Sequence, residues 1–114
     1  MSFIKIFRLK EGDDIISFYE KGKGTLKLIH PVAVYITYTK ENADELIMKF
    51  WLPSSLIVKN EVEIHPSSIL AVMEPKEEMK ELYFNFLNGL DITANLNVED
   101  ILEGIDAKNT NKIH

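Results

Sequence analysis

Residues 3–39 are rich in β-branched and aromatic side chains and lack the spacing of an amphipathic helix, which predicts β-strands. The clearest alternation lies in 32–39, where Val32, Val34 and Ile36 fall on one face of an extended strand. Further short apolar runs follow up to residue 73. The strands that this pattern predicts are 3–9, 14–20, 25–30, 32–39, 45–52, 61–64 and 69–73.

Turn-forming residues separate these runs. Gly12 lets the chain reverse after the first strand, KGKG at 21–24 is a two-glycine turn, and KENAD at 40–44 is a polar hairpin loop. Pro31 has no N–H to donate to a strand ladder, so it marks a break, an edge or a sharp bend. The chain up to residue 73 therefore predicts short antiparallel strands joined by tight turns.

The pattern changes to helical spacing at Pro75. A proline at the first helical position, followed by Glu77 and Glu78, is typical of a helix start. One apolar stripe follows at helical spacing: Met79, Leu82, Tyr83, Phe86 and Leu87. Gly89 predicts the C-terminal end of this helix. We expect a helix over 75–88 that lays this stripe on the strands or on a neighbouring subunit.

The last part of the chain carries a weaker pattern. Residues 97–105 predict a short helix with Asn97 as its cap, and the polar end of the chain is expected to fray. The domain expected from the whole pattern is 1–90, with strands over about 3–74 and the helix after them, followed by a C-terminal extension over 91–114.

Short antiparallel strands followed by one helix favour a mainly β fold in which a small barrel removes exposed edges. The stretch IFRLKEGDDII at 6–16 resembles the opening of the first Sm motif. The stretch IHPSSI at 64–69 has the spacing of the second Sm motif, isoleucine-arginine-glycine-x-x-isoleucine. The resemblance implies a strongly bent, five-stranded, antiparallel Sm-like (LSm, SH3-like) barrel; a general SH3-like or OB barrel is the alternative.

Three further elements are similar to small Sm-like proteins of tailed phages, many of them from marine samples. They are Gly12 to Ile16, Trp51-Leu52-Pro53, and Met73-Glu74-Pro75 leading into a helix. This resemblance implies a phage-encoded protein that works in the host-cell cytoplasm. The charges at Lys5 and Arg8 exclude a signal-peptide core near the start, and no apolar run is long enough to span a membrane, so we expect a cytoplasmic protein without a membrane partner.

RNA binding is the alternative function that the resemblance raises. In RNA-binding Sm-like proteins an aspartate and an asparagine shape a base pocket, and their places fall near Lys23 and Lys27. The arginine and glycine of the second motif are replaced by His65 and Pro66, and Pro66 has no N–H. The net charge of −5 also counts against nucleic acid. If RNA binds, the candidate contacts are Lys21, Lys23, Lys27, His30 and His65.

Self-assembly is the favoured expectation. In the Sm-like family the fourth strand of one subunit pairs with the fifth strand of the next, and the corresponding edges here are Glu45–Leu52 and Ile69–Met73. The early strands carry large apolar residues on both faces, which favours an oligomer or a helical cover. The candidate interface residues are Leu46, Met48, Phe50, Trp51, Ile69, Ala71 and Met73.

Residues that could carry catalysis or bind a metal are few. The chain has no cysteine, and its histidines (His30, His65 and His114) lack the close spacing of paired zinc ligands. The acids of EGDD at 11–14 do not match a calcium loop and are expected to stay solvated around a glycine turn. No G-x-S-x-G elbow is present. We therefore expect a non-enzymatic oligomeric scaffold or protein-binding module with no metal and no cofactor.

Overall fold

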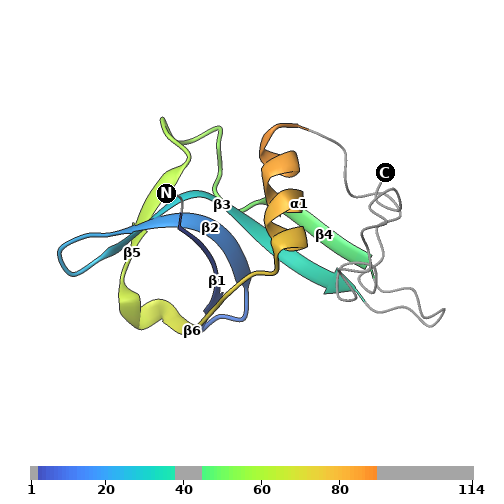
Figure 1. Cartoon of the computed structure of the whole chain (residues 1–114). Helices are drawn as coiled ribbons and strands as arrows, with labels where there is room; N and C mark the ends of the chain where they lie inside the picture. The colour runs from blue at the N-terminus through green and yellow to red at the C-terminus, as the bar shows by residue number, and fades with distance from the viewer. Residues whose placement is uncertain (1–2, 38–44, 90–114) are drawn as a thin grey trace. The chain divides into compact units, whose positions relative to one another are not determined.

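The computed structural model describes residues 3–37 and 45–89 (Figure 1). The described chain is mainly β. Its elements are β1 (Ile4–Leu9), β2 (Asp14–Lys21), β3 (Leu26–Thr37), β4 (Glu45–Phe50), β5 (Glu61–Ile64), the 3₁₀ turn η1 (Pro66–Ser68), β6 (Ile69–Met73) and α1 (Glu77–Leu87). The expected loop at 40–44 and the expected helix at 97–105 lie outside the described residues.

The strands form one antiparallel sheet of 6 strands in the order β4-β3-β2-β1-β6, and β5 also pairs with β3. The prediction of a mainly β, antiparallel fold with one helix is confirmed. The sheet is not closed. Within the described residues β5 pairs with β3 and β6 pairs with β1, and β5 and β6 follow each other along the chain through η1 without pairing with each other. The expected closed five-stranded barrel is therefore replaced by an open sheet.

Two compact units can be distinguished by their internal contacts. The first consists of Met1–Val34 and Lys49–Pro75, and the second of Tyr35–Met48 and Lys76–His114. The first unit holds β1, β2, most of β3, β5 and β6, whereas the second holds the end of β3, most of β4, and α1. Each unit is described separately below.

The core of the first unit lies around β2. Ile15 and Ile16 are adjacent and both are 0% exposed, although adjacent strand residues point to opposite faces. Phe7 and Leu9 of β1 are also buried. Both faces of β2 are thus covered within one chain at this point.

A β-bulge lies in the middle of β3. Ile16 pairs with Val32 and Phe18 pairs with Ile29, so His30 and Pro31 together face one residue of β2. His30 has a φ of +58°. The strand continues through Pro31, so 25–30 and 32–39, which were predicted as two strands, form one strand. Of the alternatives for Pro31, a break does not occur, and the left-handed residue before the proline absorbs the irregularity.

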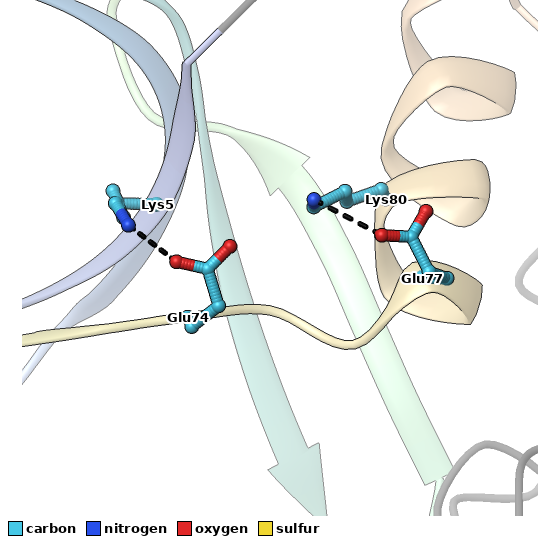
Figure 2. A network of polar contacts seen from close by, with 4 residues as sticks. All are labelled: Lys5, Glu74, Glu77 and Lys80. Carbon is cyan, nitrogen blue, oxygen red and sulfur yellow. Dashed lines mark hydrogen bonds and ion pairs between the residues drawn. The ribbon is translucent and has the colours of Figure 1, made fainter.

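The second unit contains α1, which begins at Glu77 rather than at Pro75. Lys76 is the N-cap because its backbone is extended (φ −70°, ψ 158°), so the prediction of Pro75 as the first helical residue was wrong. Within the first turn, Lys80 Nζ lies 3.2 Å from Glu77 Oε2 (Figure 2). Gly89 has a φ of +81°, as a glycine that ends a helix does.

The apolar stripe of α1 is buried in its first part. Met79, Leu82 and Tyr83 are buried, whereas Phe86 and Leu87 are half-buried. The predicted stripe is therefore correct in its spacing.

Candidate binding site

A cavity of about 460 Å³ opens in the first unit beside the turn that joins β2 to β3. Its walls come from that turn (residues 21–25), from β1 and β2, and from the segment 66–72 that contains η1 and most of β6. We refer to it as the turn cavity. Its volume falls in the range of about 300–1,000 Å³ that is common for binding sites in proteins.

One wall of the turn cavity is aromatic and aliphatic. Phe7 is 2% exposed, and its ring centroid lies 5.6 Å from that of Tyr19 in an edge-to-face arrangement. Across the β1–β6 pair, Phe7 faces Val72 and Leu9 faces Ile69. A register shift at Arg8/Leu9 makes this possible, since without it Ile69 and Val72, three residues apart, would lie on opposite faces. The bulge therefore directs both aliphatic side chains of β6 into this wall.

The opposite wall is the β2–β3 turn, which is kept tight by glycine. The N–H of Gly22 donates to the carbonyl of Thr25 over 2.9 Å, and a Cβ at Gly22 would lie only 3.1 Å from Thr25 Oγ1. Gly24 has a φ of +79°, a conformation that favours glycine. Thr25 Oγ1 donates to Glu63 Oε1 over 3.2 Å and so ties the turn to β5. Among the described lining residues, Lys21 alone carries a charge.

Three of the five predicted RNA contacts lie at or next to this cavity. Lys21 lines it, and Lys23 is exposed between the two turn glycines. His65 immediately precedes Pro66, which lines the cavity, and caps η1 through Nδ1, which accepts the N–H of Ser67 at 3.2 Å. Lys21, Lys23 and His65 thus belong to the two segments that form the cavity rim.

The other two predicted RNA contacts, Lys27 and His30, do not line the turn cavity. Lys27 Nζ lies 3.9 Å from a carboxylate oxygen of Glu20 and 3.8 Å from one of Glu61. Its charge is therefore balanced by two neighbouring carboxylates. His30 sits in the bulge of β3, with its ring centroid 6.5 Å from that of Phe18.

The predicted interface residues of 45–52 differ in exposure. Leu46 and Met48 of β4 are each only 5% exposed in the single chain. Phe50 is 48% exposed, whereas Trp51 is half-buried and its N–H donates to the carbonyl of Pro31 over 3.3 Å. Phe50 is therefore the most accessible of these four predicted residues.

On β6 the exposure pattern is the reverse of the predicted one. Ile69, Ala71 and Met73 are half-buried, while Leu70 is 64% exposed and Val72 is 55% exposed. Sequence reasoning missed Leu70 and Val72, because alternation says which residues share a face but not which face is covered. The bulge at the start of the β1–β6 pair leaves no recognisable mark in the sequence.

The EGDD stretch forms a turn held by an ion pair. Arg8 donates two hydrogen bonds to Asp14, from Nε to Oδ1 at 2.8 Å and from Nη2 to Oδ2 at 2.9 Å. These bonds and the charge of Asp14 raise the pKa of Arg8 above its usual value. The reversal itself relies on Gly12, whose φ is +106° and whose N–H donates to the carbonyl of Leu9. Asp14 therefore serves the hairpin instead of remaining simply solvated.

Within 3–37 and 45–89, no three acidic or histidine side chains are grouped so that they could hold a metal ion. His114 lies outside these ranges. The described helix is too short to cross a membrane. The first unit thus offers an apolar cavity with one cation and, beside it, the exposed strand β6, an arrangement suited to binding an apolar side chain or a ring. No family model and no curated protein matches the chain.

Proposed function

We propose that this chain is a non-enzymatic, self-assembling scaffold of the Sm-like type, and that it associates through β6. The observation that carries the proposal is the state of this strand. It pairs with β1 along one edge, no other described strand pairs with it, and Leu70 and Val72 are 64% and 55% exposed. An edge strand with apolar side chains is a template for pairing with another chain.

The place of β6 in the sheet agrees with the resemblance of the sequence to Sm-like proteins. The stretch 6–16, similar to the first Sm motif, spans β1, the turn and the start of β2, and the stretch 64–69 spans the β5–η1–β6 connection. In the Sm-like family the last strand of the barrel pairs with a strand of the next subunit. β6 is the last strand of the described sheet in chain order, and this supports the proposal of a homo-oligomer of a phage-type Sm-like protein acting in the cytoplasm of the host cell.

Light scattering coupled to size exclusion tests this function. We expect wild type to be an oligomer at micromolar concentration and Leu70→Lys to shift it to monomer, because a lysine on an edge strand opposes pairing. Ile36→Lys is the matched control, since Ile36 is an exposed strand residue (44%) outside β6. A monomeric wild type, or an unchanged mass for Leu70→Lys, would overturn the proposal.

As a second candidate we propose RNA binding at the turn cavity. The observation in its favour is that Lys21, the ring of Tyr19 and the Pro66 segment line one cavity. Bases stack on aromatic rings and phosphates pair with lysines in single-stranded RNA sites. The pairing of Lys27 with two carboxylates weighs against it.

Filter binding of oligo-U and oligo-A at several salt concentrations separates this candidate from the first. If RNA binds, Lys21→Glu with Lys23→Glu should weaken binding and lower the salt slope by about 2. Lys27→Gln is the control, and it should change little because Lys27 already faces Glu20 and Glu61. Absence of binding at low salt refutes this candidate.

A further inference from the structure

The end of α1 carries the one asparagine of the chain that is followed by glycine, Asn88–Gly89. Asparagine is among the heat-labile residues of proteins, because a backbone nitrogen can attack its side-chain amide. Glycine in the next position favours this attack, since it has no Cβ to hinder the nitrogen. Both Asn88 and Gly89 are exposed. The pair therefore combines a reactive sequence with access to water.

The loss of the side-chain amide needs only the chain itself and water. The nitrogen of Gly89 forms a bond to Cγ of Asn88, and the side-chain nitrogen leaves as ammonia with the proton that Gly89 gives up. Water then opens the resulting succinimide at either of its carbonyl carbons. The product is aspartate, or isoaspartate in which the main chain runs through the former side-chain carbonyl. One neutral amide is thus replaced by one carboxylate.

The folded helix end holds Asn88–Gly89 in an unreactive geometry. The N–H of Asn88 donates to the carbonyl of Phe84, and the N–H of Gly89 donates to the carbonyl of Phe86, each over 3.0 Å. Asn88 has a ψ of 7°, which places the nitrogen of Gly89 on the side of the nitrogen of Asn88 and not beside its Cβ. The five-membered succinimide requires the position beside Cβ. The ring can therefore close only after ψ has rotated and the hydrogen bond of Gly89 has broken.

We propose that Asn88–Gly89 is a modification site that loses its side-chain amide when the last turn of α1 opens, and that the carboxylate formed there keeps this turn loose. The carbonyl end of a helix is the negative end of its dipole, so a negative charge there is unfavourable. The last turn of α1 holds no basic residue that would balance this charge. Both residues belong to the second unit, whereas β6 belongs to the first, so the inference does not depend on the proposed self-assembly.

Peptide mapping by tandem mass spectrometry of the folded full-length protein, held at mildly alkaline pH, tests the site. We expect aspartate and isoaspartate at Asn88 and no comparable conversion at Asn85, which lies in the same helix before Phe86. The chain unfolded in guanidinium chloride should convert at Asn88 at least about tenfold faster, because the folded helix end is open for only a fraction of the time. Asn88→Gln, which keeps an amide on a longer side chain, is the matched control and should not convert. Equal conversion at Asn85 and Asn88, or equal rates in the folded and unfolded chains, would overturn the inference.

Two substitutions at position 85 test whether the last turn is the gate. Glycine weakens a helix interior relative to alanine, by an amount equivalent to about fivefold in the open population. We therefore expect Asn85→Gly to convert at Asn88 about fivefold faster than Asn85→Ala does. Ile15→Ala removes a buried side chain of the first unit and should leave the rate unchanged, because the opening is local. Equal rates for the two variants at position 85, or a faster rate in Ile15→Ala, would overturn the gate.

Hydrogen exchange tests the effect of the new carboxylate. We expect the amide of Gly89, which bonds to the carbonyl of Phe86, to be less protected in Asn88→Asp than in Asn88→Gln. Both variants have a polar side chain at the same position, so the comparison isolates the charge. Equal protection in the two variants would overturn the proposal that the carboxylate keeps the turn loose.

Discussion

The backbone N–H of His30 donates to the carbonyl of Asn60 over 2.8 Å, and His30 itself has a φ of +58°. In a regular strand, adjacent residues direct their backbone polar groups to opposite edges. Here the N–H of His30 and the carbonyl of Pro31 both bond to the loop that joins β4 to β5 (residues 51–60), since Pro31 accepts the N–H of Trp51. The left-handed residue breaks the alternation, and β3 thereby holds both ends of the loop.

This geometry predicts opposite effects of two substitutions at position 30. A left-handed backbone costs an L-residue about 1–2 kcal/mol, and glycine avoids that cost. We expect His30→Gly to keep the free energy of unfolding or raise it by up to about 1 kcal/mol. His30→Val should lower it by about 1–3 kcal/mol, because a β-branched residue tolerates this conformation poorly. Urea denaturation followed by circular dichroism measures both, and equal stability of the two variants would contradict the bulge.

The turn at Gly12 predicts a second stability effect. With φ at +106°, Gly12 occupies a conformation that side chains rarely adopt, so Gly12→Ala should lower the free energy of unfolding by about 1–3 kcal/mol. The control Glu11→Ala should change the free energy of unfolding by less than about 0.5 kcal/mol.

Because the acids of this stretch serve a turn, calcium chloride or EDTA should leave the urea midpoint of wild type unchanged. A shift of the midpoint with calcium would reveal a bound ion.

Two apolar residues of opposite exposure allow a third prediction. Ile15 is 0% exposed, so Ile15→Ala should lower the free energy of unfolding by about 2–5 kcal/mol through lost burial and a cavity. Val58 is 100% exposed, so Val58→Ala should change it by less than about 0.5 kcal/mol in the Leu70→Lys background. Measurements in that background exclude a contribution from pairing through β6. A large loss for Val58→Ala there would mean that the loop contributes to the fold of a single chain.

Local sequence signals predicted most of the strands and the helix. Features that depend on contacts between distant parts of the chain were not predicted. The burial of Ile15 and Ile16 and the helix end at Gly89 follow from short apolar runs and turn residues. The continuation of β3 through Pro31 did not, because it depends on a left-handed His30 that no propensity favours. The open sheet was also missed, since the pairing of β5 with β3 and of β6 with β1 depends on contacts between residues far apart in the chain.

The candidate site was predictable only in part, for the same reason. The motif-like spacing drew attention to Lys23 and His65 at the cavity rim, and also to Lys27, which does not line the cavity. Lys21, which does line it, was predicted only as one of a group of lysines. The apolar wall, by contrast, needs Phe7 to meet Val72, residues far apart in the chain that come together through the β1–β6 register. A bulge that sets such a register leaves no periodic signal in the sequence.

An ion pair between β1 and the residue after β6 predicts how stability depends on pH. Lys5 donates a hydrogen bond to the carboxylate of Glu74 (Figure 2). This bond raises the pKa of Lys5 above its ordinary value of 10.5; desolvation opposes the shift, and electrostatic attraction to Glu74, with a smaller contribution from Tyr19, adds to it. The pair therefore favours the protonated lysine in the folded state.

Because the folded-state pKa of Lys5 is raised, its contribution to stability is complete below the ordinary pKa and is lost as pH rises through the folded value. We expect the difference in urea midpoint between wild type and Glu74→Gln to be constant near neutral pH and to shrink above about pH 10.5. Other groups that titrate at high pH are common to both proteins, so the difference isolates the pair. A difference that grows with pH would show that Glu74 acts on stability by another route, whereas Lys5→Met should remove the pH dependence of the effect of Glu74→Gln.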